Sequence, residues 1–214
     1  MRSRLHPRVL LVEGNDELRA LPELLELTGV PWPRGNEPVH IKQLEGVENI
    51  LATGLIEAEA KASGLLSLGI LLDADGDIET RWRRVQERMT ESFSAFPHEL
   101  EPDGTIFVPD GGPRVGVWIM PDNVRSGMLE TMLLGLRSGA PAVSDYARQA
   151  VARARAIGAT FRDAHRDKAE LHTWLAWQDP PGLQVHLAVK SRIISPEPGT
   201  CGGFVGWFRA LFEV

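Results

Sequence analysis

The segment LGILLDADGD, residues 68–77, constrains the fold of this chain more than any other stretch. Its apolar part, residues 69–72, carries no charge, and carboxylates follow at every second position as Asp73, Asp75 and Asp77. A short apolar run that ends in acidic residues is typical of a buried strand in a parallel sheet. Because side chains two residues apart in an extended segment point the same way, we expect Asp73 and Asp75 to project together.

Two explanations of these carboxylates are open at this point. Carboxylates so close together repel one another, and a bound divalent cation relieves the repulsion. Ligands that are all oxygens favour Mg²⁺ or Mn²⁺. The alternative is an acidic turn between a strand and a helix, in which Asp77 caps the helix.

A second apolar strand, Arg8–Val12, also ends in acidic residues. The sequence EGNDE follows it and supplies Glu13, Gly14, Asp16 and Glu17. Gly14 permits a sharp turn into a helix. Because open α/β sheets bind ligands at the carboxyl ends of their strands, we expect Glu13 to lie beside Asp73 and Asp75.

The apolar periodicity along the chain predicts the fold class. Strand and helix patterns alternate through residues 8–12, 17–27, 39–44, 46–63, 68–73 and 78–96, and two more strands follow at 105–109 and 115–120. Later patterns predict helices at 126–136, 142–157, 161–178 and 204–212, with a strand at 185–194. We therefore expect an α/β core at residues 1–125, with a mostly parallel sheet flanked by helices. A mainly helical extension at 126–214 would pack on that core.

One strand ending in Glu13-Gly14 and a later strand ending in Asp73-Ala74-Asp75 resemble the Toprim domain. Topoisomerases, bacterial primases, small ribonucleases and the overcoming-lysogenization-defect (OLD) nucleases share this Rossmann-like domain. Within that superfamily, the chain is most similar to small standalone Toprim-like proteins related to the OLD nucleases. The resemblance covers roughly the first 125 residues.

The resemblance implies a metal-dependent nuclease that cleaves DNA or RNA with one or two Mg²⁺ or Mn²⁺ ions. In this interpretation Asp73 and Asp75 hold metal, and Glu13 holds metal or acts as an acid/base. Lys168, on the helix expected after the core, would stabilise charge on the phosphate. The further candidate metal ligands are Asp16, Glu17, Asp77, Asp122 and Glu130. For Glu130 the alternative is a solvent-facing position on helix 126–136, which Ser126 is expected to cap.

Nucleic acid would need a local basic surface, because the net charge is -6. Residues 148–168 hold six basic residues against two acidic ones. The candidates for contacts with a phosphate backbone are Arg148, Arg153, Arg155, Arg162, Arg166 and Lys168. A solvated helix surface is the alternative explanation of the same residues.

Other functional classes are limited by what the chain carries. Its one tyrosine, Tyr146, lies on an expected helix, which argues against a topoisomerase nucleophile. One cysteine, Cys201, cannot build a disulfide framework or the zinc module of a primase. The segment DADGD also resembles the haloacid dehalogenase phosphatase motif, with Asp73 as nucleophile, although Asp77 stands where Thr is usual. A non-catalytic Toprim-like scaffold that binds nucleic acid or a partner is the third interpretation.

The sequence lacks several motifs, and their absence guides what we expect of its partners and its location. The sequence lacks a phosphate-binding Gly-x-x-x-x-Gly-Lys-Ser/Thr loop, so any ABC/AAA-type ATPase of the OLD kind, as in phage defence, would be a separate protein. No apolar run reaches membrane-spanning length, and the start, MRSRLHPR, does not have the pattern of a signal peptide. We therefore expect a cytoplasmic protein. The strongly apolar last helix could bury against a second copy in a homo-oligomer.

Overall fold

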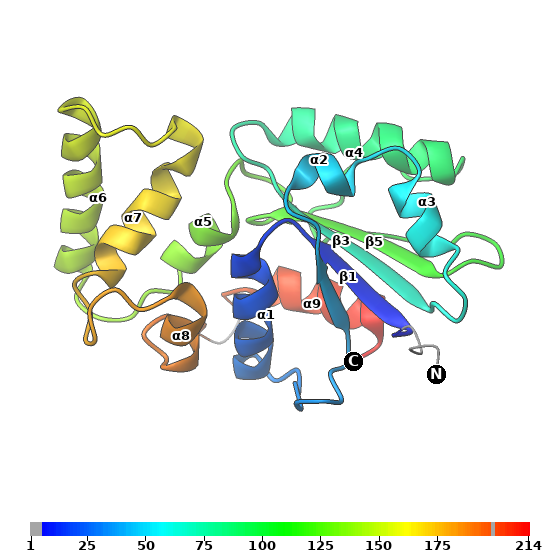
Figure 1. Cartoon of the computed structure of the whole chain (residues 1–214), viewed down its shortest axis with the longest axis horizontal. Helices are drawn as coiled ribbons and strands as arrows, with labels where there is room; N and C mark the ends of the chain where they lie inside the picture. The colour runs from blue at the N-terminus through cyan, green and yellow to red at the C-terminus, as the bar shows by residue number, and fades with distance from the viewer. Residues whose placement is uncertain (1–5, 198–199) are drawn as a thin grey trace.

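A computed structural model describes residues 6–197 and 200–214. Its five strands form one sheet in the order β2-β1-β3-β5-β4 (Figure 1). Four strands are parallel, and β4 pairs antiparallel with β5 at the edge of the sheet. The strands are β1 (Arg8–Val12), β2 (His40–Gln43), β3 (Ser67–Asp73), β4 (Thr105–Phe107) and β5 (Arg114–Met120). This arrangement confirms the α/β class and the mostly parallel sheet.

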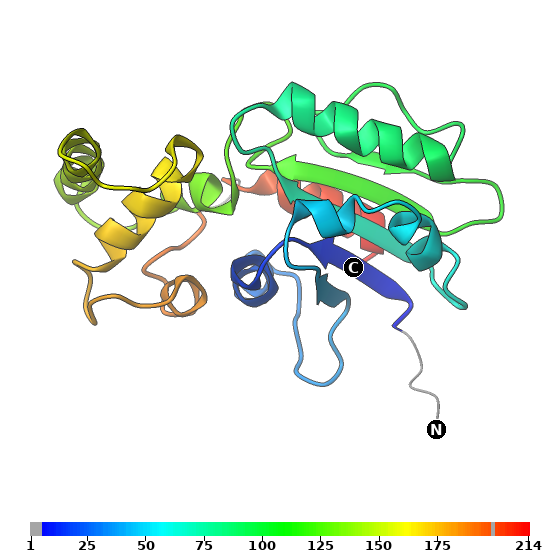
Figure 2. The same cartoon turned by 45° about the horizontal axis from the view of Figure 1, so that its top comes forward.

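Helices cover both faces of the sheet because successive residues of the buried strands point to opposite sides. Leu11 of β1 packs with α2 (Val47–Ile50), α3 (Leu55–Ala60) and α4 (Ile78–Ser92) on one face. Leu10 packs on the other face with α1 (Asn15–Leu27) and α9 (Gly202–Phe212). Figure 2 shows α4 above the sheet and α9 behind and below it. The fold therefore has three layers.

A pair of facing glycines allows α9 to lie directly on the sheet. Gly69 of β3 is in register with Gly116 of β5. A Cβ at Gly69 would come within 2.7 Å of the Phe212 ring, and a Cβ at Gly116 would come within 2.7 Å of Leu211. Larger residues at these two positions would push the closing helix away from the core.

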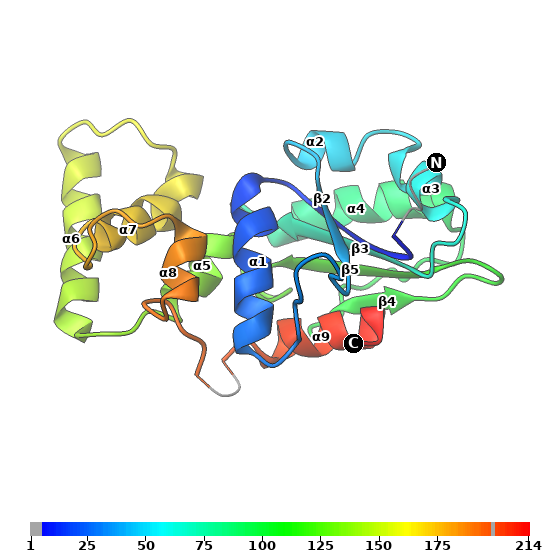
Figure 3. The ribbon, with the colours of Figure 1, turned by 60° about the horizontal axis from the view of Figure 1, so that its bottom comes forward.

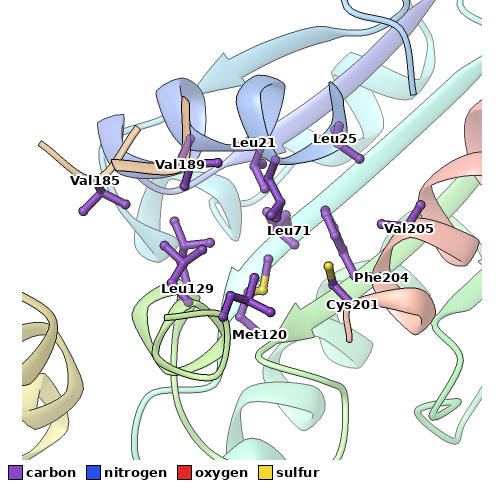
Figure 4. Close-up of a cluster of buried hydrophobic side chains, with 14 of the residues drawn as sticks. Leu21, Leu25, Leu71, Met120, Leu129, Val185, Val189, Cys201, Phe204 and Val205 are labelled. Carbon is purple, nitrogen blue, oxygen red and sulfur yellow. The ribbon is translucent and has the colours of Figure 1, made fainter. Parts of the chain in front are cut away.

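The C-terminal part is mainly helical and continues the core of the α1 face. Its helices are α5 (Leu129–Leu134), α6 (Pro141–Ala156), α7 (Arg166–Leu175) and α8 (Val185–Lys190), with a 3-10 turn at Asp163–His165. Helix α8 lies alongside α1 (Figure 3). Figure 4 shows Val185 and Val189 of α8 with Leu21 of α1 and Leu129 of α5, all of which belong to one buried cluster.

Four sequence predictions about single elements are corrected. The strand predicted at 185–194 is wrong, because Val185, Ala188 and Val189 form the buried side of helix α8. The predicted helix 46–63 is two helices, since Gly54 between them takes a left-handed conformation with φ 78°. Helix α5 begins at Leu129 with Met128 at the N-cap position, so Ser126 is not the cap. The predicted helix 161–178 is the 3-10 turn followed by the shorter α7.

No helix in the described ranges has both the length and the apolar character needed to cross a bilayer. The N-terminal segment that we expected to lack a signal peptide includes residues 1–5, which lie outside the described residues.

Candidate metal and phosphate site at the strand ends

A pocket of about 620 Å³ opens where β1, β2 and β3 end, and α5 and α7 form its other wall. In Figure 1 these strands run toward the helices of the C-terminal part. We call it the acidic pocket, because eight of its lining residues are carboxylates: Glu13, Asp16, Glu17, Glu45, Glu48, Asp73, Asp75 and Glu130. Its remaining charged or titratable side chains are Arg162, His165 and Lys168.

Hydrogen bonds to the side chains of Glu13 and Asp73 join β1, β3 and α5 at the floor of the acidic pocket. Because β1 and β3 are parallel neighbours, both strands end at the same edge of the sheet. The backbone amide of Asp73 donates to Oε1 of Glu13 at 2.9 Å. The amide of Leu129, at the start of α5, donates to Oδ1 of Asp73 at 3.0 Å. Two carboxylates are thus fixed by main-chain donors rather than by cations.

Glu17 is the most buried carboxylate of the first helix and adds a third negative group. It is 8 % exposed, and its Oε2 accepts the amide of Gly14 at 3.0 Å, which completes the first turn of α1. Burial, with smaller contributions from the charges of Glu130, Glu13 and Asp16, raises its pKa to about 7. The pocket therefore favours the protonated, uncharged form of the Glu17 carboxyl.

The pKa values of the two carboxyls on the pocket floor rise for the same reason. Burial is the main cause for Asp73, and the charges of Glu17, Glu13 and Glu130 push its pKa still further above the ordinary value. Burial also raises the pKa of Glu13, although the amide of Asp73 opposes this rise. Burial in a poorly solvated pocket is therefore the main cause of both shifts, and neighbouring carboxylates add to the shift of Asp73.

Lys168 of α7 is the cation that faces this cluster. Its Nζ donates to Oδ2 of Asp16 at 2.8 Å and lies 2.9 Å from Oε1 of Glu130. Glu130 is only 3 % exposed, so its carboxylate meets Lys168 largely away from water. Burial lowers the pKa of Lys168, but the contacts with Asp16 and Glu130 outweigh burial and raise it. Lys168 therefore stays charged in the pocket.

Asp75 is turned toward a different cation, Arg81 of α4. Strand β3 ends at Asp73, and Asp75 has a left-handed backbone with φ 55°. Strand alternation therefore does not align Asp75 with Asp73, although both line the pocket. Nη2 of Arg81 donates to Oδ2 of Asp75 at 2.6 Å. Arg81 is 7 % exposed, and its Nε and Nη1 have no partner within the described part of the chain.

The donor chemistry of the acidic pocket fits a hard divalent cation, because its donors are carboxylate oxygens. Burial, more than neighbouring charge, raises the pKa values of Glu13, Glu17 and Asp73. The side chains are held by main-chain amides and by Lys168 and Arg81. Within residues 6–197 and 200–214, no three acidic, histidine or cysteine side chains converge as a preformed metal site. Ligation would therefore require these side chains to rearrange.

Comparison with known protein families decides where the chain belongs. Residues 7–213 match DUF3226, a protein family of unknown function. The chain is a member of the DUF3226 family. Neither a curated protein nor a solved structure matches it. Because the match includes both the sheet and the C-terminal helices, the two walls of the acidic pocket belong to one DUF3226 unit.

Two predicted ligands of this DUF3226 chain lie outside the acidic pocket. Asp77 is the N-cap of α4, where it accepts the amide of Glu79 at 3.1 Å and the hydroxyl of Thr80. This is the capping role that the sequence left open. Asp122 accepts the amide and the Nε of Arg125, at 2.8 and 2.6 Å, and lines a different pocket.

The predicted basic residues of the DUF3226 chain divide into two groups. Arg162 and Lys168 line the acidic pocket, where Arg162 also lies 2.6 Å from Nε2 of His165. The other four are exposed on α6 or at the start of α7: Arg148, Arg153, Arg155 and Arg166.

Sequence reasoning missed four charged or titratable residues in or beside the acidic pocket. Glu45 and Glu48 follow β2, so the rule that identified Glu13 and Asp73 could have found them too. His165 belongs to no motif of the sequence, and it lies at the end of the 3-10 turn before α7. Nothing in the sequence marked Arg81, whose position depends on how α4 packs over the sheet.

Proposed function

We propose that the acidic pocket is the active site of a metal-dependent nuclease of Toprim type. The observation that carries this proposal is the junction of Glu13 and Asp73 at the ends of neighbouring parallel strands, facing Lys168. Toprim-like domains are expected to carry a glutamate and an aspartate pair at these strand ends. The sheet order and the parallel register of β1 and β3 support the same assignment.

Glu13, Glu17 and Asp73 would hold the cation, and Asp75 would join them on release from Arg81. A bound Mg²⁺ or Mn²⁺ would polarise the phosphate and lower the pKa of a water molecule. If Glu13 does not ligate the metal, it is the candidate general base, because burial raises its pKa and so makes it a stronger base. Lys168, which stays charged, would face the phosphate and offset the negative charge that develops there.

The substrate class that suits this pocket is a nucleic acid backbone. Arg162 and Lys168 line the pocket, and Arg153 and Arg166 are exposed on the neighbouring helical surface. Basic side chains around an acidic centre position phosphates without reading bases. The proposal therefore covers both DNA and RNA, and a separate ATPase partner remains part of it by resemblance.

A non-catalytic, Toprim-like binding scaffold is the second candidate. The observation that favours it is the engagement of the carboxylates with main-chain amides, Lys168 and Arg81. In this alternative the same pocket would bind a basic or metal-bridged partner without turnover.

A cleavage assay separates the two candidates. Plasmid DNA, single-stranded DNA and total tRNA are incubated with the full chain and Mg²⁺, Mn²⁺ or EDTA, and Mn²⁺ binding is measured by calorimetry. The variants are Glu13→Gln and Asp73→Asn, and Asp122→Asn is the matched control outside the acidic pocket. Metal-dependent cleavage that both variants lose and the control keeps supports the nuclease. Absence of both cleavage and Mn²⁺ binding would overturn it in favour of the scaffold.

A further inference from the structure

A second pocket, of about 640 Å³, lies on the C-terminal side of β5 and shares α5 with the acidic pocket. We call it the arginine-lined pocket, because Arg125, Arg137 and Arg148 line it together with only two carboxylates, Asp122 and Glu170. Thr131 and Met132 of α5 form part of its wall, whereas Met128 and Glu130 line the acidic pocket. Its size is that of a small-molecule site.

The first turn of α9 opens into the arginine-lined pocket, with Gly203 and Phe204 in the wall. In any α-helix the first amides have no acceptor within the helix. No side chain caps this end, and its first turn holds no acidic residue. The start of this eleven-residue helix therefore presents a partial positive charge to the pocket.

An independent observation comes from Trp118 of β5, which forms part of the same wall. Its side chain is 2 % exposed, and its Nε1 has no acceptor within residues 6–197 and 200–214. An indole N–H buried without an acceptor costs free energy, so an acceptor is expected at this position. The ring of Trp118 also packs against Phe204, with centroids 5.6 Å apart, which makes this wall aromatic.

The arginines of this pocket are already held by carboxylates. Arg137 pairs with Glu170 at 2.9 Å, and both side chains are largely buried. Arg125 pairs with Asp122, and Arg148 pairs with Asp145 on its own helix. The buried pair with Glu170 fixes Arg137. Each of the three arginines keeps further N–H donors, since one guanidinium carries five. A phosphate accepts several such donors at once.

From these features we infer that the arginine-lined pocket binds a small organic phosphate. Its phosphate would be held by the first amides of α9 and by Arg125 and Arg148. Its organic part would lie against Trp118 and Phe204, with an acceptor near Nε1 of Trp118. This inference does not depend on the proposed nuclease function, because it uses no residue of the acidic pocket.

Calorimetry tests the inference with the full chain in buffer containing EDTA, which prevents metal-bridged binding in the acidic pocket. The probes are AMP, ribose 5-phosphate, inorganic phosphate and uncharged adenosine. We expect AMP or ribose 5-phosphate to bind at least about tenfold more tightly than inorganic phosphate, and adenosine to bind more weakly still.

Three variants remove single donors while keeping the pocket. Arg125→Gln and Arg148→Gln should each weaken binding about tenfold, and Trp118→Phe should weaken it several-fold with the aromatic packing preserved. The matched control is Arg83→Gln, an exposed change on α4 outside the pocket, which should leave the affinity unchanged.

Three outcomes would overturn the inference. They are no binding of the organic phosphates at millimolar concentration, equal affinity for inorganic phosphate, and affinity that the Arg125 and Arg148 variants do not change. Circular dichroism of each variant confirms that a loss of binding is not a loss of folding.

Discussion

The acidic pocket and the arginine-lined pocket share helix α5 but balance their charges in opposite ways. In the acidic pocket, burial and neighbouring carboxylates raise the pKa values of Glu17 and Asp73. In the arginine-lined pocket, burial acts to raise the pKa of Asp122, but hydrogen bonds from Arg125 outweigh it and lower that pKa. One pocket therefore concentrates uncompensated charge, while the other pairs each carboxylate with an arginine.

This difference separates two uses of buried charge. Uncompensated carboxylates destabilise the fold and favour the binding of a cation, which is typical of functional sites. Paired charges hold side chains in place and leave spare donors. Helix α5 borders both environments, because its first amide donates to Asp73 of the acidic pocket and its Thr131 and Met132 line the arginine-lined pocket.

The largest expected effect is a loss of cleavage rate in variants of the acidic pocket but not of the arginine-lined pocket. Glu13→Gln and Asp73→Asn should each reduce metal-dependent cleavage by about 10²–10³-fold, because each removes a ligand or base from the reacting centre. Initial rates on the cleaved substrate measure the effect. Asp122→Asn, in the arginine-lined pocket, should keep the rate within a few-fold. A comparable loss in Asp122→Asn would mean that the two pockets are not separate in function.

Removal of a paired charge from the arginine-lined pocket should instead lower the free energy of unfolding. Arg137→Met leaves Glu170 buried without its partner and should lower the free energy of unfolding by about 3 kcal/mol. Urea denaturation followed by circular dichroism measures the change. The double variant with Glu170→Leu should recover part of the loss, since no unpaired charge then remains. If the double variant is no more stable than Arg137→Met, the pair is not the source of the loss.

The dependence of stability on pH should come from the acidic pocket. The pKa of Glu17 rises from 4.5 to about 7 on folding, so between these values the folded state binds more protons than the unfolded state. The free energy of unfolding should therefore fall as the pH rises from about 5 to 8, by on the order of 3 kcal/mol from this group. The raised pKa values of Glu13 and Asp73 act in the same direction.

Denaturation curves at several pH values, with EDTA present, measure this dependence. Glu17→Gln should flatten it, and Asp122→Asn should not. Stability that rises over the same interval would contradict the assignment of uncompensated charge to the acidic pocket.

The smallest expected effect comes from Asp77, which lies just outside the acidic pocket. Asp77→Ala removes the N-cap of α4 and should cost about 1 kcal/mol in the free energy of unfolding. Mn²⁺ affinity, measured by calorimetry, should stay the same, because Asp77 does not line the pocket. A clear loss of affinity in Asp77→Ala would extend the acidic pocket along the turn after β3.

Much of the acidic pocket follows from strand ends that the sequence already marks. Glu13 and Asp73 each come directly after an apolar strand, and parallel strands end at one edge of a sheet. The local apolar pattern predicted the wrong element where one run of residues fits both the strand period and the helix period. Residues 185–194 read as a strand, whereas Val185, Ala188 and Val189 have the spacing of one helix face and pack on α1. Tertiary contact decided between the two.

The sequence by itself determined the α/β class, the strand order in the chain and the carboxylates at the strand ends, because these depend on local periodicity and on covalent spacing. Only the tertiary structure decided which cations face those carboxylates. Lys168 lies 152 residues from Asp16, and the two meet because α7 and the start of α1 border the same pocket. The arginine-lined pocket likewise forms only where β5, α5, α6 and α9 meet. Long-range packing places such charges, and no local pattern encodes it.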